Sequence, residues 1–205
     1  MFQAITAIGH LHRNGLMHRD LKPENFLVST SNVEGMKPRR FQRTIKLADF
    51  GLVRNYRDKT GPPLTEYVST RWYRAPEIVL RSKNYNEKVD IFALACNMAE
   101  LYLRRPLFPG RTESEQLNTI ISVLGTPLQK DWPEGYKLAA DLGQTINQSY
   151  GKNEPGKLKP LFSQQSQTTI SSYISDDAIN LLEGMLAFDP AKRFTAQQCL
   201  SHPYF

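Results

Sequence analysis

The chain has 205 residues, with 26 Lys and Arg residues against 20 Asp and Glu residues, which gives a formal net charge of +6. Hydrophobic residues make up 40% and charged residues 22% of the sequence, a balance that excludes general disorder and supports one domain with a sizeable core. Only two cysteines are present, Cys96 and Cys199, too few for a disulfide framework, so a reducing intracellular compartment is expected.

A membrane or nucleic-acid partner is not expected. The most apolar stretch, 91–99, is much shorter than the roughly 20 residues that a membrane span needs. The first nine residues lack the basic leader of a signal peptide. Basic residues cluster between Lys37 and Lys59, but neither aromatic residues interleaved with them nor zinc-ligand spacing favours nucleic-acid binding over a solvated loop.

In chain order, residues 1–14 are predicted to form a helix, because apolar residues recur at spacings of three and four and Asn14-Gly15 is a suitable stop. A loop between short strands is predicted for 16–28, a polar loop for 29–44 and a short strand for 44–47. Residues 52–74 are polar and lack periodicity, which is typical of a functional segment inside a compact domain.

Most of the remaining chain is predicted to be helical. Residues 89–103 are apolar on nearly every face, which indicates a helix buried at the centre of a domain. Segments 114–124 and 176–186 are amphipathic, and 195–200 is predicted to be a last short helix. Residues 128–167 are rich in Gly, Pro, Asn and Gln, so irregular structure with one short helix is predicted there.

Three segments carry residues suited to catalysis. They read His-Arg-Asp-Leu-Lys-Pro-Glu-Asn at 18–25, Asp-Phe-Gly at 49–51 and Ala-Pro-Glu at 75–77. In this order and at these separations, they resemble the signature set of protein kinases. An Asp-Phe-Gly alone would more often be a tight turn, whereas the matched set indicates chemistry.

Phosphoryl transfer explains these residue types, because the protein must position groups and neutralise charge on the transferring oxygens. Asp20 is placed to accept the proton of the substrate hydroxyl. The amide oxygen of Asn25 and the carboxylate of Asp49 are ligands suited to Mg²⁺, and Lys22 is a point charge suited to the γ-phosphate of ATP. The resemblance implies that Lys22 marks serine/threonine kinases and that Thr70 braces Asp20 and Lys22.

The resemblance also implies a regulated site. Arg19 and Arg74 would pair with a phosphate on the activation segment. Thr65 and Tyr67 are the expected phosphate acceptors, which requires an upstream activating kinase; the alternative is that both are plain exposed hydroxyls. Two further residues, Glu77 and Arg193, would form a structural ion pair.

The order Thr-Glu-Tyr at 65–67 followed by Trp-Tyr-Arg-Ala-Pro-Glu at 72–77 is similar to the CMGC group, which contains the MAP kinases and the cyclin-dependent kinases. Segments 98–102, 105–110, 123–127 and 131–136 resemble the RCK family most. That family includes the male-germ-cell-associated and intestinal-cell kinases, which act in cilia and flagella. The resemblance implies protein substrates with proline after the phosphoacceptor and a location in the cytoplasm, nucleus, cilium or flagellum.

The fold class implied is mainly α: the C-terminal lobe of a protein kinase, with short β hairpins around the catalytic loop. Residues 1–205 would form this lobe, with the catalytic loop at 18–25, an insertion at 29–44, the activation segment at 49–77 and a CMGC-type helical insert at about 107–175. No glycine-rich loop precedes His18, so the N-terminal β lobe is expected to be absent and the chain inactive alone. Phe92, Ala95 and Phe194 depart from the usual Trp, Gly and Pro.

Two hypotheses follow. The first is a serine/threonine kinase that uses ATP and Mg²⁺ and carries the base, metal ligands and substrate platform in this chain. The second is a non-catalytic scaffold or dominant-negative lobe that binds substrates and regulators. Intact base and metal residues favour the first, because a binding module has no physical need of them.

Overall fold

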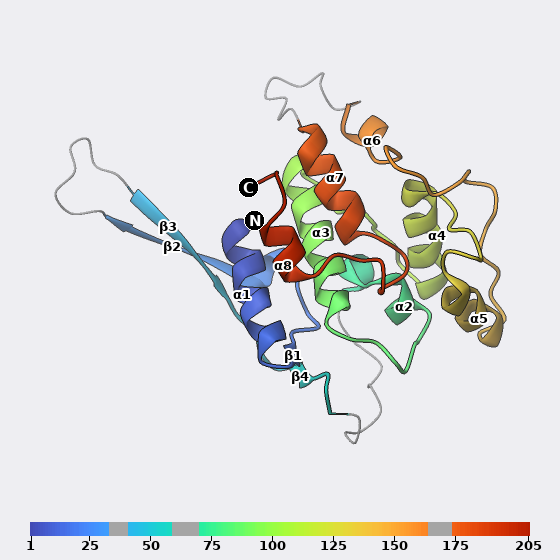
Figure 1. The fold of residues 1–205 in the computed structure, drawn as a ribbon, viewed down its shortest axis with the longest axis horizontal. Helices are drawn as coiled ribbons and strands as arrows, with labels where there is room; N and C mark the ends of the chain where they lie inside the picture. Colours follow the sequence, from blue (N-terminus) through green and yellow to red (C-terminus); the bar gives the residue numbers. More distant parts are fainter. Residues whose placement is uncertain (33–40, 59–69, 164–173) are drawn as a thin grey trace.

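A group of helices packs around one buried helix, α3 (Lys88–Leu103), which lies at the centre of the molecule (Figure 1). The computed structural model describes residues 1–32, 41–58, 70–163 and 174–205. Almost every side chain of α3 up to Ala99 is buried, and α3 contacts α1 and α7. The helix therefore contributes apolar surface on all sides, as its uniformly apolar sequence predicts.

The remaining elements are mostly short. The helices are α1 (Phe2–Arg13), α2 (Pro76–Val79), α4 (Glu113–Leu124), α5 (Pro133–Asp141), α6 (Lys159–Ser163), α7 (Asp176–Met185) and α8 (Ala196–Leu200), with 3-10 turns at Pro23–Asn25 and Arg71–Tyr73. The strands are β1 (Leu16–Met17), β2 (Phe26–Asn32), β3 (Phe41–Leu47) and β4 (Arg54–Asn55). None of the helices in the described parts is long and apolar enough to cross a membrane.

Helix α1 leads directly into the catalytic loop. Its apolar face is buried against the core, and Gly9 lies against Ala196 of α8, where a Cβ atom on Gly9 would come within 3.3 Å of the alanine methyl group. The helix ends at Asn14, and Gly15 follows with a φ of +77°, a conformation that glycine adopts without steric cost. The predicted helix and its stop are confirmed.

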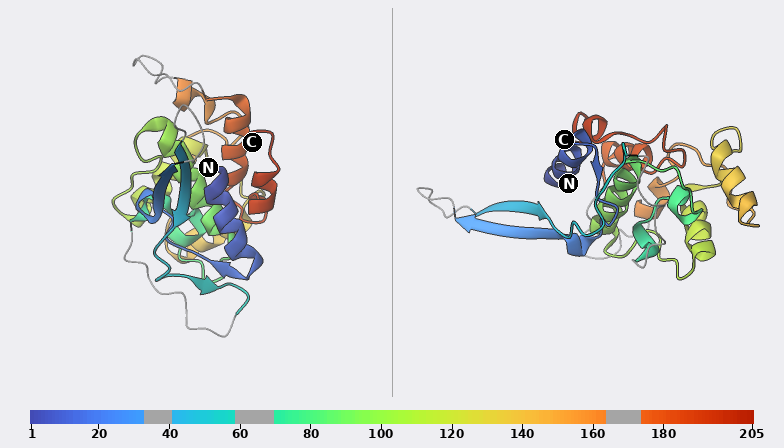
Figure 2. Two further views of the ribbon diagram at one scale, coloured as in Figure 1. Left: turned by 90° about the vertical axis from the view of Figure 1, so that its left-hand side faces the viewer. Right: turned by 90° about the horizontal axis from the view of Figure 1, so that it is seen from below.

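Two antiparallel two-stranded sheets flank the loop within the described residues. Strand β1 pairs with β4, and β2 pairs with β3 over seven residue pairs, from Phe26 opposite Leu47 to Asn32 opposite Phe41. The β2–β3 ribbon extends away from the helices, as Figure 1 and the right-hand view of Figure 2 show. Its base adjoins the catalytic loop, because the Ala48 N–H donates to the Asn25 carbonyl at 2.9 Å.

The prediction of a polar loop over 29–44 was therefore wrong at both ends. Strand β2 continues through residues 29–32 and β3 begins at residue 41, while residues 33–40 lie outside the described part. The ribbon is exposed on both faces over most of its length, so no alternation of apolar and polar residues marks these strands. The backbone ladder, rather than burial of one face, stabilises this part of the hairpin.

The predicted helices at 89–103, 114–124, 176–186 and 195–200 are confirmed to within two residues. The described part of 128–167, up to residue 163, holds two short helices, α5 and α6, rather than one. Helix α2 and strand β4 were not predicted, because a four-residue helix and a two-residue strand are too short to show a period.

Candidate active site

The catalytic loop is held to the central helix by Asp90, in the first turn of α3. One carboxylate oxygen of Asp90 accepts the backbone N–H of His18 and the other accepts the backbone N–H of Arg19, both at 2.8 Å. The His12 ring also donates from Nε2 to Asp90, at 2.9 Å. Asp90 is 1% exposed, so these charge-assisted bonds act where water does not compete, and they fix the loop backbone in place.

Two residues of the candidate site have left-handed backbone conformations. Arg19 has a φ of 70° and Asp49 a φ of 61°. Residues other than glycine adopt this region at a cost on the order of 1–2 kcal/mol each. The bond from the Arg19 N–H to Asp90 shows how the fold holds one of these strained residues.

His18 joins the catalytic loop to the segment that carries Asp49. A carbonyl can only accept, so the contact of 3.1 Å to Ala48 O means that His18 Nε2 carries the proton. Its Nδ1 then accepts the backbone N–H of Asp20 at 3.3 Å. The ring also packs edge-on against Phe50, with centroids 5.5 Å apart. One fully buried side chain thus sets the position of both acidic segments.

Asp20, Lys22 and Asn25 form a connected polar group. Lys22 Nζ donates to Asp20 Oδ2 at 2.9 Å, while Asn25 Nδ2 donates to the Asp20 carbonyl at 2.7 Å and to Oδ2 at 3.4 Å. Asp20 and Asn25 are buried, whereas Lys22 is half-buried. The Asn25 nitrogen is used in these bonds, so its side-chain oxygen is the atom left to contact a cation.

Asp49 lies within electrostatic reach of this group. The hydrogen bond to Asp20 raises the pKa of Lys22; burial opposes the shift, and the negative charges of Asp20, Asp49 and Glu24 add to it. The Asp49 side chain is exposed, and its Oδ1 accepts the Gly51 N–H at 3.4 Å. Lys22 therefore remains protonated at neutral pH.

These residues fit a magnesium ion that is shared with a nucleotide. The described residues contain no group of three or more His, Cys, Asp and Glu side chains able to hold a metal. Mg²⁺ typically takes only one or two protein carboxylates, with phosphate oxygens and water completing the shell. The oxygens of Asp49 and Asn25, beside the lysine ammonium of Lys22, supply such a partial donor set.

The other predicted site residues lie near the same loop. Thr70 is exposed at the start of the 3-10 turn Arg71–Tyr73, and Thr70 and Arg74 line one pocket together with Arg19 and Asp20. The Arg19 side chain donates from Nε to the Leu52 carbonyl at 2.6 Å and from Nη1 to the hydroxyl of Tyr85 at 3.1 Å. The predicted phosphate acceptors, Thr65 and Tyr67, lie outside the described residues.

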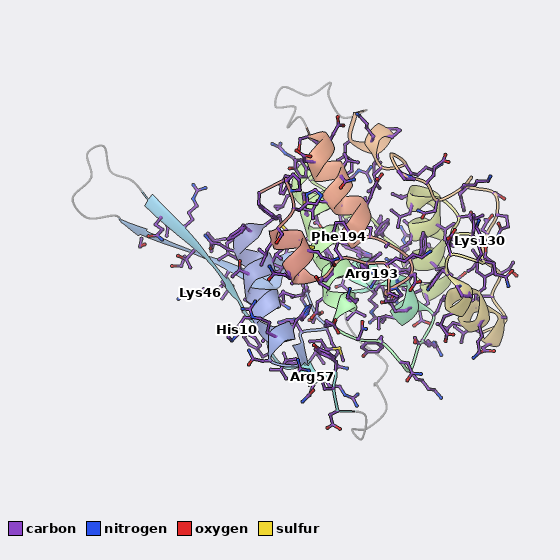
Figure 3. All side chains as sticks on the ribbon, in the orientation of Figure 1. His10, Lys46, Arg57, Lys130, Arg193 and Phe194 are labelled. Atoms are coloured by element: carbon purple, nitrogen blue, oxygen red, sulfur yellow. The ribbon has the colours of Figure 1, made fainter. Side chains whose placement is uncertain are left out.

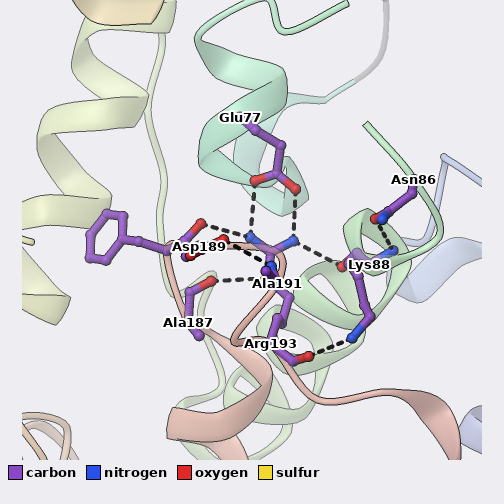
Figure 4. A network of polar contacts seen from close by, with 8 residues as sticks. Glu77, Asn86, Lys88, Ala187, Asp189, Ala191 and Arg193 are labelled. Carbon is purple, nitrogen blue, oxygen red and sulfur yellow. Dashed lines mark hydrogen bonds and ion pairs between the residues drawn. The ribbon is translucent and has the colours of Figure 1, made fainter. Parts of the chain in front are cut away.

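Glu77 and Arg193 form a bidentate ion pair, with Nη–Oε distances of 2.7 and 2.9 Å (Figure 4). The guanidinium also donates to the carbonyl groups of Ala187, Lys88 and Phe188. The Arg193 side chain is 0% exposed and lies among the helices (Figure 3). All five N–H donors of the arginine are thus used, which ties α2 and α3 to the segment after α7.

Two residues that position the loop were not found by sequence reasoning. Asp90 holds the His18 and Arg19 amides, and Asn97, also on α3, donates from Nδ2 to the carbonyls of Leu21 at 3.3 Å and Ala93 at 2.7 Å. The available signal was the presence of two polar residues inside the otherwise apolar stretch 89–99 of this helix, since buried polar groups need partners.

Comparison with known proteins gives a consistent set of relatives. The protein kinase domain model matches residues 1–205. The serine/threonine-protein kinase ICK of Mus musculus is 45% identical over 205 residues, which is 100% of this chain and 28% of that protein. The serine/threonine-protein kinase MAK of Homo sapiens is 44% identical over the same length, 29% of that protein. Cyclin-dependent kinase F-3 of Oryza sativa subsp. japonica is 40% identical, over 41% of its length. The chain spans less than half the length of each of these relatives.

Proposed function

The chain belongs to the protein kinase family, and we propose that it supplies the catalytic loop and metal ligands of a serine/threonine kinase that transfers the γ-phosphoryl group of ATP to protein hydroxyls. The observation that carries this proposal is the joined arrangement of Asp20, Lys22 and Asn25, with Asp49 in electrostatic reach. A scaffold would not require a buried carboxylate bonded to a lysine and an amide beside a second, exposed carboxylate.

In the proposed reaction, Asp20 accepts the proton of the substrate hydroxyl as that oxygen attacks the γ-phosphorus, while the bond from the γ-phosphorus to the β–γ bridging oxygen breaks and ADP leaves. The bonds from Lys22 and Asn25 fix the orientation of the Asp20 side chain. General-base assistance of this kind contributes about 10²–10⁴-fold in rate. The clamp from Asp90 keeps the backbone of the loop in place during the attack.

Lys22 binds an oxygen of the transferring phosphoryl group and offsets its negative charge. Asn25 and Asp49 would hold Mg²⁺ through their side-chain oxygens, and the bound cation would neutralise charge on the phosphates. The same lysine pairs with Asp20, so it links the base to the phosphoryl group. Thr70, at the rim of the same pocket, is proposed to brace Asp20 and Lys22.

Within the kinase family, we assign the chain to the RCK family. The support is the 44–45% identity to the ICK and MAK kinases over its whole length. We further propose that residues 1–205 correspond to the larger, C-terminal lobe of the kinase domain. Its parts would be the catalytic loop at 18–25, an insertion at 29–44, the activation segment at 49–77 and a helical insert at about 107–175. A lobe of this kind lacks part of the nucleotide site, so the 205-residue chain alone should have little activity.

We extend the proposal to the regulation of the kinase, its substrates and its location. A phosphate on Thr65 or Tyr67, added by an upstream kinase, would be bound by Arg19 and Arg74, which line one pocket. Substrates would carry proline after the phosphoacceptor, and a peptide array that showed no preference for proline would contradict this. We propose an intracellular location, with the cilium or flagellum as the site to examine first by imaging of the tagged protein.

The test of the proposed function is phosphorylation of protein by a polypeptide of the relatives' length that contains this chain. Asp20→Asn and Asp49→Asn should each lower the rate by at least about 100-fold, with unfolding midpoints close to that of the wild type. Asp141→Asn serves as a matched control, because Asp141 is an exposed carboxylate at the end of α5. Its rate should be unchanged.

Phosphorylation that survives Asp20→Asn, or that is absent from the wild type, would contradict the kinase assignment. The scaffold alternative makes a different prediction. It expects substrate binding without turnover, and it expects Asp20→Asn to leave that binding unchanged.

A further inference from the structure

Among the residues that the structure describes, the β2–β3 ribbon has one edge covered and one edge open. At the outer edge of β3, the side-chain amide of Gln3, on α1, takes the place of a neighbouring strand. Its Nε2 donates to the Arg43 carbonyl at 3.1 Å and its Oε1 accepts the Ile45 N–H at 2.6 Å. These are the backbone groups that another strand would use, so Gln3 blocks this edge.

The same contacts fix which groups of β2 face outward. Residues 43 and 45 point to Gln3, so the even-numbered residues of β3 carry the bonds between the two strands. Their partners on β2 are Leu27, Ser29 and Ser31. The N–H and C=O groups of Val28 and Thr30 therefore point to the outer edge of β2, where the described part of the chain offers them no partner strand.

The open edge lacks the usual protection against pairing. Natural edge strands carry charges, prolines or bulges that prevent association. Strand β2 reads Phe-Leu-Val-Ser-Thr-Ser-Asn and has neither a charge nor a proline, and Leu27 is 55% and Val28 62% exposed. The two basic residues of the ribbon's described part, Arg43 and Lys46, lie on β3 instead.

We propose that β2 pairs with β2 of a second copy of this chain, in an antiparallel arrangement about a twofold axis at Ser29. Val28 of each copy then lies opposite Thr30 of the other, and these two pairs exchange about four backbone hydrogen bonds. The result is a four-stranded sheet in the order β3-β2-β2-β3. This inference goes beyond kinase activity and does not depend on it.

Three features favour a second copy over another occupant. The edge is self-complementary, because antiparallel pairing about Ser29 matches each donor with an acceptor of the same segment. An uncharged strand brings no like charges together across the axis. The twofold axis also reverses the strand direction, so the helices of the two copies lie at opposite ends of the joined ribbon, which itself extends clear of the helices (Figure 2).

Blocking of the β3 edge by Gln3 makes the assembly close at two copies. With one edge available, pairing ends at the dimer, whereas two open edges would allow continued addition.

Sedimentation velocity of the 205-residue chain over a series of protein concentrations tests the proposal. The wild type should show a monomer–dimer equilibrium that shifts toward the dimer as concentration rises. Thr30→Pro should abolish the dimer, because proline lacks the outward N–H, and an outward-facing edge position tolerates proline without loss of the hairpin. Thr30→Val is the matched control, since it keeps both the N–H and the β-branched shape, and it should still dimerise.

Hydrogen exchange adds a residue-level measurement. The amides of Val28 and Thr30 should become protected as concentration rises, while the amide of Arg43, on the far edge of the ribbon, should not change. A wild type that stays monomeric, or a Thr30→Pro variant that still dimerises, would overturn the proposal. Pairing of β2 with an unrelated extended peptide in a chain that remains monomeric would overturn it as well.

Discussion

Asp90 binds the backbone of His18, 72 residues earlier in the chain, through a 2.8 Å hydrogen bond from the His18 N–H to its carboxylate. The same carboxylate also holds Arg19 and His12. A single buried charge in the central helix therefore sets the position of the loop that carries Asp20, and the site depends on α3 as much as on the loop's own sequence.

Substitution of this carboxylate should both destabilise the fold and misplace the loop. In Asp90→Asn, the new amide nitrogen faces an N–H donor, which leaves a buried donor without an acceptor. The free energy of unfolding should fall by about 3 kcal/mol, the upper range for an unsatisfied buried polar group. Urea denaturation measures this loss, and Asp141→Asn should stay within about 0.5 kcal/mol of the wild type.

The Glu77–Arg193 pair predicts an asymmetry between its two partners. Glu77→Gln leaves the guanidinium bound to three backbone carbonyls, whereas Arg193→Met removes the donor from a buried carboxylate and from the carbonyls of Ala187 and Phe188. Breaking a buried ion pair costs about 3–5 kcal/mol in the free energy of unfolding. Arg193→Met should therefore be at least as destabilising as this range, and more so than Glu77→Gln.

The double variant Glu77→Leu with Arg193→Met separates the ion pair from the carbonyl bonds. If Arg193 bound only Glu77, replacing both residues by apolar side chains would restore stability. Because the carbonyls of Ala187 and Phe188 would lose the donor that Arg193 provides, the double variant should stay well below the wild type. Urea denaturation that gave wild-type stability for the double variant would show that these carbonyl bonds contribute little.

Alkaline pH should destabilise the protein through its buried thiols. Burial raises the pKa of the Cys199 thiol from an ordinary value of 9.0 to about 12, and it raises that of Cys96 as well. Between pH 9 and 12 the unfolded chain releases the Cys199 proton while the folded chain keeps it. The unfolded state then binds fewer protons, so the free energy of unfolding falls as pH rises. Tyr73, whose pKa burial also raises, acts in the same direction.

Denaturation at pH 8 and pH 10, with reductant present, measures this effect. One pH unit above its ordinary pKa, Cys199 accounts for a loss of about 1.4 kcal/mol. The drop between the two pH values should therefore be smaller by about that amount in Cys199→Ala than in the wild type. Equal drops in the two proteins would exclude ionisation of this thiol as a cause.

The long helices could be predicted from sequence because burial of one or more faces of a helix determines where its apolar residues recur. Helix α4 has a clear apolar face, and α3 is apolar all round, which are patterns that only a helix packed in a core requires. The β2–β3 ribbon could not be predicted beyond its base, since both faces of residues 29–31 and 42–44 are exposed. Apolar and polar residues therefore do not alternate along these strands, and alternation is the pattern that predicts a strand.

The same limit applies to the candidate site. Asp20, Asn25 and Asp49 could be chosen from sequence because phosphoryl transfer requires these residue types in this order. Asp90 could not, because its role depends on a contact that joins segments 71 and 72 residues apart. A local motif shows which groups could do chemistry, whereas the tertiary fold determines what holds them.

The most direct test of the account is rescue of Asp49→Cys by a thiophilic metal, in a polypeptide of the relatives' length. We assign metal binding to Asp49 and proton acceptance to Asp20. Asp49→Cys should be inactive with Mg²⁺ and should regain phosphorylation activity when Cd²⁺ is added, because thiolates prefer softer metals. Asp20→Cys should gain nothing from Cd²⁺. Full activity of Asp49→Cys with Mg²⁺ alone, or equal rescue of the two variants, would contradict the assignment.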